Sequence, residues 1–180
     1  MSGTYVIFDR DGTLIKHIEY LIDPSKVELL PGVTEGLKLL SKCGFKFGII
    51  TNQSVIGRGR ALETDVDSVN TKVIELLAGN SFDFRFVLVC PHSPLDNCNC
   101  RKPAPGLGLI AIEQYGLNPL ESYMVGDKES DVLFGNSIGC KSILLASSNS
   151  IDSKASFIAE GFQSAAQFIA NDSKKRKINE

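Results

Sequence analysis

The chain has 180 residues, of which 43% are hydrophobic and 22% are charged, and its formal net charge is −2. This length and composition indicate one globular domain with a core large enough to fold unaided. The charge gives no reason to expect a nucleic acid partner, and no apolar run is long enough to cross a membrane.

Apolar, β-rich segments alternate with helix-like segments along the chain. Such alternation predicts βαβ units and therefore the α/β class, with a Rossmann-like parallel sheet flanked by helices. We expect a single domain over residues 1–172 and a polar, solvated tail over 173–180, which contains the basic run KKRK. The expected strands are Thr4–Asp9, Phe45–Asn52, Phe84–Cys90, Ser122–Asp127 and Lys141–Ser147, and the expected helices are 33–44, 63–78, 107–115 and 130–138, followed by a short strand and a final helix.

The first predicted strand stops at two carboxylates, Asp9 and Asp11, which Gly12 and Thr13 follow at once. Like charges this close repel one another unless a cation lies between them or one of them is protonated. Mg²⁺ fits this position because it is a hard ion that prefers a few carboxylates together with water and a phosphate oxygen. The alternative is that the two aspartates only cap a turn.

Polar residues also end other predicted strands, and ligands of parallel α/β sheets bind beyond these carboxyl ends. Asp127 therefore joins Asp9 and Asp11 as a candidate Mg²⁺ ligand. Asp131, one helical turn later, is expected to orient Asp127 without binding the ion itself. Thr51 ends the second strand, and its hydroxyl group can donate hydrogen bonds to phosphoryl oxygens.

Two neighbouring cations, Arg101 and Lys102, follow the third strand and supply positive charge for a phosphoryl group. With the acids above, they predict a site that holds a phosphate group through Mg²⁺, where a carboxylate attacks the phosphorus atom. A protein that only binds phosphate is the competing functional class, and such a protein would not need Asp11.

Four motifs, FDRDGTL, ITNQS, RKP and GDKESD, occur in this order at the predicted strand ends and resemble the signature motifs of the haloacid dehalogenase superfamily. The resemblance covers nearly the whole chain and implies a phosphatase in which Asp9 is the nucleophile. Asp11 would then act as general acid and base, and Thr51 and Lys102 would complete the catalytic set. The segments between these motifs are too short for a full cap domain, so a capless fold with a comparatively open site is expected.

A cysteine-rich loop over residues 90–100 places Cys90, His92, Cys98 and Cys100 directly before the RKP motif. Three thiolates and one imidazole form a closed tetrahedral set that suits structural Zn²⁺. The opening MSGTYVIF lacks the pattern of an export signal, so we expect a reducing cytoplasm, where clustered thiols favour metal over disulfides. Free thiols and disulfides are the alternatives.

Within the superfamily, the chain resembles two groups of capless members with a zinc loop. These are the phosphatases of D-glycero-D-manno-heptose 1,7-bisphosphate and those of histidinol phosphate. RKPAPG favours the heptose group, which would imply a small phosphorylated sugar as substrate, a role in surface glycan or lipopolysaccharide synthesis, and a monomer. The resemblance implies the following substrate-binding positions: His17, Ile18, Glu19, Tyr20, Thr51, Asn52, Gln53, Ser54, Arg101, Lys102 and Lys128.

Two further arginines, Arg58 and Arg60, lie in the GRGR segment after the second motif. They would offset the charge of Glu19 if they held a second phosphate of the substrate. A solvated loop explains them equally well.

Overall fold

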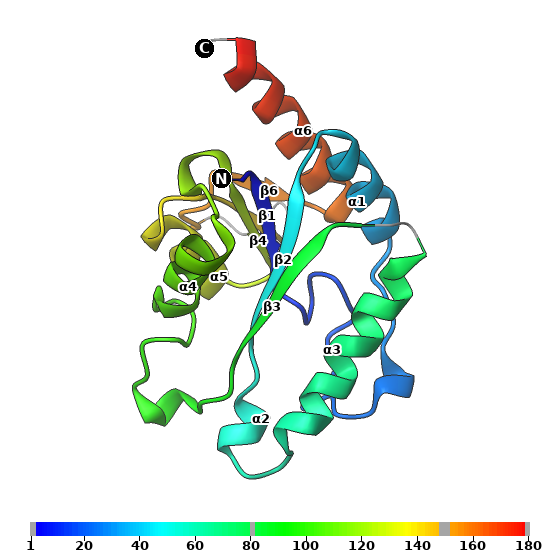
Figure 1. Ribbon diagram of the computed structural model, residues 1–180, viewed down its shortest axis with the longest axis vertical. Helices are drawn as coiled ribbons and strands as arrows, with labels where there is room; N and C mark the ends of the chain where they lie inside the picture. The colour runs from blue at the N-terminus through cyan, green and yellow to red at the C-terminus, as the bar shows by residue number, and fades with distance from the viewer. Residues whose placement is uncertain (1–2, 80–81, 148–151, 179–180) are drawn as a thin grey trace.

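The structure, a computed structural model, describes residues 3–79, 82–147 and 152–178. Its centre is a six-stranded sheet in which every neighbouring pair is parallel, in the order β3-β2-β1-β4-β5-β6 (Figure 1). The chain proceeds outward from β1 to β3 and then returns to the other side of β1, so the switch point lies between β1 and β4. The strands are β1 (Tyr5–Phe8), β2 (Lys46–Asn52), β3 (Phe84–Cys90), β4 (Tyr123–Gly126), β5 (Lys141–Leu145) and β6 (Phe157–Ala159).

Helices cover both faces of the sheet, with α1, α3 and α6 on one face and α4 and α5 on the other (Figure 1). Along β1, Val6 and Phe8 pack into the first of these cores and Ile7 packs into the second, because successive side chains of a strand point to opposite faces. Burial on both faces explains why the strand sequences are almost continuously apolar. The helices are α1 (Val33–Lys42), α2 (Ser54–Gly57), α3 (Glu63–Ala78), α4 (Gly106–Tyr115), α5 (Glu129–Ser137) and α6 (Phe162–Ile178), with 3₁₀ helices η1 (Pro24–Lys26), η2 (Pro94–Asp96) and η3 (Pro119–Glu121).

The predicted α/β class and flanked parallel sheet are confirmed, and the connections between strands leave no room for a cap domain. Within the described residues, only η1 and α1 separate β1 from β2, and only α2 and α3 separate β2 from β3. The carboxyl ends of the strands are therefore not covered by a separate layer. Among the described helices, none combines the length and the apolar character that a membrane span requires.

The segment expected to be a polar, solvated tail, 173–180, is helical as far as Ile178, because α6 continues to that residue, while Lys174 and Lys175 are exposed. Asp172 accepts hydrogen bonds from the Tyr123 hydroxyl group at 2.7 Å and from Lys141 Nζ at 2.8 Å. Arg176 pairs with the same carboxylate at 2.9 Å and lies 4.9 Å from the centre of the Tyr123 ring. These contacts attach the last turns of α6 to the sheet, and residues 179–180 lie outside the described residues.

Candidate active site

The first two acids lie in a tight turn directly after β1. The backbone N–H of Asp9 still donates to the Val125 carbonyl of β4 at 2.9 Å, so this residue is fixed at the edge of the sheet. Gly12 adopts a φ of 83°, and a Cβ atom there would come within 2.4 Å of Asp127 Oδ2. Only glycine meets both requirements, and the turn therefore brings the ends of β1 and β4 together.

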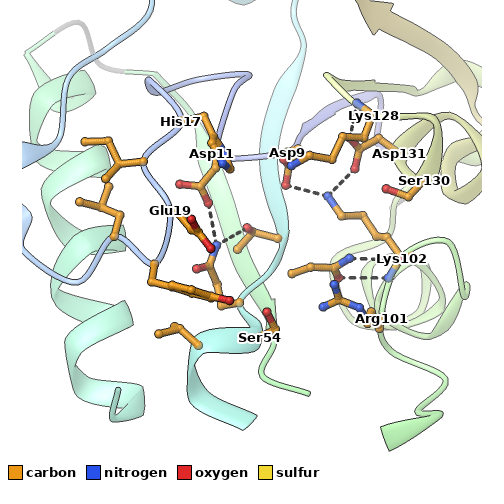
Figure 2. Close-up of a pocket in the computed structure, with 17 residues that line it drawn as sticks. Asp9, Asp11, His17, Glu19, Ser54, Arg101, Lys102, Lys128, Ser130 and Asp131 are labelled. Atoms are coloured by element: carbon orange, nitrogen blue, oxygen red, sulfur yellow. Dashed lines mark hydrogen bonds and ion pairs between the residues drawn. The ribbon is translucent and has the colours of Figure 1, made fainter. Parts of the chain in front are cut away.

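A buried ammonium group connects three elements of the site. Lys102 Nζ lies 2.8 Å from Asp9 Oδ1 and 2.7 Å from Asp131 Oδ1 (Figure 2). It also donates to the Ile50 carbonyl at 2.6 Å. Burial alone would lower the pKa of this lysine, but the carboxylates of Asp9 and Asp131 outweigh it and raise the pKa above its ordinary value. Lys102 therefore carries its charge and holds Asp9 in one orientation.

Two reciprocal hydrogen bonds fix the backbone of Lys102. The side chain of Asn52, the last residue of β2, donates to the Lys102 carbonyl and accepts from its N–H, both at 3.1 Å. Thr51, one residue earlier, is buried, and its hydroxyl oxygen accepts a hydrogen bond from Gln53 Nε2 at 2.8 Å. This bond leaves the hydroxyl hydrogen of Thr51 available for a phosphoryl oxygen.

Three acids at the switch point form a group that fits a divalent cation. Carboxylate oxygens of Asp9, Asp127 and Asp131 all lie within 4.8 Å of one another. Asp127 Oδ1 is buried and lacks a hydrogen-bond partner within the part of the chain that the structure describes. Burial raises the pKa of Asp127 to about 6, against the effect of Lys128 and with the help of the Asp9 and Asp131 charges. A cation would supply the missing partner and relieve this repulsion.

The group of three acids differs from the predicted set of Mg²⁺ ligands at two positions. The carboxylate of Asp11 does not belong to the group of three acids, because it turns toward Gln53 and Arg10. Asp131, expected only to orient Asp127, instead belongs to the group and contacts Lys102 directly. For Asp11, the reason is that a spacing of two residues in a turn does not determine where a side chain points. For Asp131, the reason is its close approach to the backbone of Gly126, where an added Cβ atom would come within 2.3 Å of the Asp131 side chain.

A fully buried arginine, which the sequence analysis missed, holds Asp11. Arg10 Nε and Nη2 donate to the two Asp11 oxygens at 3.1 and 3.2 Å, and Arg10 Nη1 donates to Asn70 Oδ1 on α3 at 2.7 Å. Gln53 Nε2 adds a third donor to Asp11 at 2.7 Å. An asparagine among Val66 and Val73 on the apolar side of α3 was a signal for this contact, since a buried amide needs a polar partner.

Asp9, Asp11, Asp131 and Lys102 line one cavity of about 330 Å³, whereas Asp127 does not line it (Figure 2). All the predicted substrate-binding residues line this cavity, so the structure brings them together. Leu21, Val55 and Ser130 also line it, although the sequence did not single them out. The predicted residues at the cavity are His17, Ile18, Glu19, Tyr20, Thr51, Asn52, Gln53, Ser54, Arg101, Lys102 and Lys128.

The predicted zinc ligands also come together, in a loop beside the cavity. Ligand atoms of Cys90, His92, Cys98 and Cys100 lie within 4.8 Å of one another, and the separations between the sulfur atoms are 3.7, 3.3 and 3.4 Å. A tetrahedral Zn²⁺ with bonds of about 2.3 Å to sulfur requires about 3.8 Å between sulfurs. The set therefore fits zinc, and none of the four cysteine and histidine side chains is left over to bind a substrate.

The zinc loop also positions Arg101, which follows its last cysteine. Arg101 Nη1 donates to the carbonyl of His92 at 3.2 Å, so the arginine is attached to the loop backbone while it lines the cavity. Arg58 and Arg60 do not line this cavity; they line a separate hollow together with Ser93 of the zinc loop.

Comparisons with known proteins agree with this site. A family profile described as HAD-hydrolase-like matches residues 99–172. The D-glycero-beta-D-manno-heptose-1,7-bisphosphate 7-phosphatase of Helicobacter pylori is 35% identical over 154 residues, which cover 85% of this chain and 88% of that protein. The histidine biosynthesis bifunctional protein HisB of Blochmanniella floridana is 35% identical over 146 residues, and the chain spans only 41% of its length.

Among solved structures, the D,D-heptose 1,7-bisphosphate phosphatase of B. bronchiseptica, complexed with magnesium and phosphate, has a TM-score of 0.84. The match covers 94% of this chain and 99% of that chain at 23% identity, a level at which it shows the likeness of fold alone. The 35% identity to the Helicobacter protein, which covers most of both chains, is high enough to show the family as well as the fold. The chain belongs to the haloacid dehalogenase (HAD) superfamily.

Proposed function

We propose that the protein is a Mg²⁺-dependent phosphatase that removes the 7-phosphate of D-glycero-D-manno-heptose 1,7-bisphosphate through an aspartyl-phosphate intermediate. The observation that carries this proposal is the position of Asp9, which the buried Lys102 ammonium holds at 2.8 Å at the edge of a cavity that also receives Asp11. One acid is thus fixed for attack and a second lies beside it for proton transfer.

In the first step, Asp9 attacks the phosphorus atom with the oxygen that does not accept from Lys102. The bond between phosphorus and the ester oxygen breaks, its electron pair goes to the leaving oxygen, and Asp11 delivers a proton there. In the second step, Asp11 takes a proton from water, and the water oxygen attacks the same phosphorus atom. The bond to Asp9 then breaks, which regenerates its carboxylate and releases inorganic phosphate.

The surrounding groups stabilise the negative charge of the phosphoryl oxygens. Lys102 contacts Asp9, the Thr51 hydroxyl group lines the same cavity, and Arg101 adds a guanidinium group from the zinc loop. Mg²⁺ held by Asp9 and Asp127, with Asp131 beside them, would offset the charge of the acids and of the phosphoryl group when bound. Zn²⁺ in the cysteine loop would have a structural role and hold Arg101 in place.

The identity of the substrate rests on similarity and on the polar character of the cavity. Glu19, His17 and Ser54 line the side of the cavity away from Lys102 and offer partners for sugar hydroxyl groups (Figure 2). The Helicobacter relative supports the heptose, and the reaction would then contribute to the synthesis of surface glycans such as lipopolysaccharide. The HisB relative, equally identical over a slightly shorter segment, supports histidinol phosphate as the second candidate.

A side-by-side assay distinguishes the candidates. We expect kcat/KM to be highest for heptose 1,7-bisphosphate when it is compared with other sugar bisphosphates and histidinol phosphate at saturating Mg²⁺. A preference for histidinol phosphate would replace the heptose with the second candidate. Full phosphate release by Asp9→Asn protein would contradict the mechanism itself, because an amide cannot form the acyl phosphate.

A further inference from the structure

We propose that Arg58 and Arg60 form a second anion subsite, which holds the phosphate group that is not hydrolysed. The two arginines follow α2 and line a hollow of about 330 Å³ together with Gly57, Ser93 and Leu95. None of the described residues that line this hollow is acidic. This inference rests on the proposed function, because only a substrate with two phosphates would occupy both sites.

The arginines of the chain fall into two sets by their partners. Half of them form ion pairs with carboxylates. Arg58, Arg60 and Arg101 have no carboxylate within 4.0 Å in the ranges 3–79, 82–147 and 152–178, and all three lie around the zinc loop. Among the described arginines, those without a carboxylate partner therefore all lie beside the zinc loop. The paired arginines are Arg10, Arg85 and Arg176.

Arg60 connects the hollow to the reaction cavity. Its guanidinium group lies over the ring of Tyr20, with 5.1 Å between the guanidinium carbon and the ring centre. Tyr20 lines the reaction cavity, whereas Arg60 lines the hollow. Stacking on the ring limits the motion of the guanidinium group while its edge stays free to donate hydrogen bonds to an anion.

The backbone of this loop is fixed against the zinc loop. Gly57 N–H donates to the Pro91 carbonyl at 2.8 Å, and a Cβ on Gly57 would come within 2.8 Å of both that oxygen and the N–H nitrogen of Ser93. Arg58 and Arg60 then donate their own N–H groups to Ser54 and Val55 carbonyls, both at 3.0 Å. The backbone that carries the two arginines is thus fixed before the ligand arrives, which reduces the entropy lost on binding.

The reaction cavity alone has too little positive charge to neutralise a bisphosphate. Four acids and three cations line it, and two of the acids already contact Lys102. Each phosphate monoester of a bisphosphate carries a charge of about −1.5 to −2 at pH 7. One magnesium ion cannot offset both groups, whereas two guanidinium groups near the second phosphate match its charge and can each donate to two of its oxygens. The acids are Asp9, Asp11, Glu19 and Asp131, and the cations are Arg101, Lys102 and Lys128.

Binding to Asp9→Asn protein, which cannot turn over, tests the subsite by calorimetry in the presence of Mg²⁺. The two ligands are heptose 1,7-bisphosphate and heptose 7-phosphate, which share the reacting phosphate and differ only in the distal one. We expect the bisphosphate to bind at least tenfold more tightly. In the protein that also carries Arg58→Ala and Arg60→Ala, we expect the ratio of the two affinities to fall to about one. Arg58→Lys and Arg60→Lys in place of the alanine substitutions should retain part of the ratio.

Arg85→Ala is the matched control, because this arginine already pairs with Asp83 at the start of β3, the end of the strand opposite to the site, and the ratio should stay at its original value. A ratio near one before the arginines are removed, or a ratio that survives their removal, would overturn the subsite. These outcomes are separate from those of the proposed function. Selective binding of the bisphosphate by Asp9→Asn protein, together with no hydrolysis by the unmodified protein, would contradict the proposed reaction and leave the subsite supported.

Discussion

The buried ammonium of Lys102 offers the sharpest test of the site. Lys102→Met removes the charge but keeps an unbranched chain of similar length. At an effective dielectric constant of about 20, the contacts at 2.8 and 2.7 Å each correspond to a gross attraction of about 6 kcal/mol. Much of this offsets the cost of burying the charges, so we expect the free energy of unfolding to fall by about 3–5 kcal/mol, as for other buried pairs that lose one partner.

Thermal unfolding and steady-state kinetics measure the two consequences. The melting temperature should fall by about 10 °C, at about 2–4 °C per kcal/mol for a chain of this size. Loss of a cation beside the phosphoryl group should lower kcat by about 10²–10³-fold. Because the three acids keep their charges, Mg²⁺ should raise the melting temperature of the variant by more than that of the unmodified protein.

Lys141→Met is the control, since this lysine lies at the same 2.8 Å from Asp172 but is 41% exposed. For such a solvent-screened pair we expect a loss of about 1 kcal/mol or less. Equal losses for the two lysine variants, or a Lys102→Met protein that Mg²⁺ stabilises no more than the original, would refute the account of a buried cation that holds two of the three acids.

Three further predictions concern Asp11, the zinc loop and α6. Asp11→Asn should lower kcat by about 10²–10⁴-fold. The Kd for Mg²⁺ measured by calorimetry should stay close to its original value, because this carboxylate lies outside the group of three acids. A large loss of Mg²⁺ affinity would contradict that geometry. Cys98→Ser should lower the zinc content found by elemental analysis and reduce the melting temperature by about 10 °C, and full stability without zinc would remove the structural role. Asp172→Asn should cost about 1–3 kcal/mol at pH 7 in urea unfolding. Although partial burial would raise the pKa of Asp172, hydrogen bonds from Lys141, Tyr123 and Arg176 lower it, so this stability is present above the ordinary pKa of 3.8 and should vanish as the pH falls below it.

The sequence predicted the regular elements because their apolar periods and ends are marked in it. The predicted helix at 63–78 and the predicted strand at 84–90 match α3 and β3 residue for residue. α2 was missed since four residues are too few to show a helical period. The last turns of α6 were missed for another reason: KKRK reads as a solvated run, and the partners of Asp172 and Arg176 lie on β4, β5 and η3, far away in the chain.

The location of the site could be predicted, but the direction of its side chains could not. Parallel strands bring their carboxyl ends to one edge, so Asp9, Thr51 and Asp127 had to lie close together whatever the details of the loops. The spacing of Asp9 and Asp11 suggested that they act on one ion, whereas Arg10 and Asn70 hold Asp11 apart from the group of three acids. That arrangement depends on a residue 60 positions away, which no local pattern contains.

The cations of the site divide by burial, and this division separates their effects on catalysis. Arg10 and Lys102 are at most 4% exposed. Arg10 donates to Asp11 and Lys102 donates to Asp9, so both orient acids that take part in the reaction. Arg58 and Arg60 are exposed and lack carboxylate partners among the described residues, so their donors are available to a ligand. Substitution of a buried cation should therefore change kcat, and substitution of an exposed one should change KM, because the first alters the reacting groups and the second alters only the binding of remote parts of the substrate.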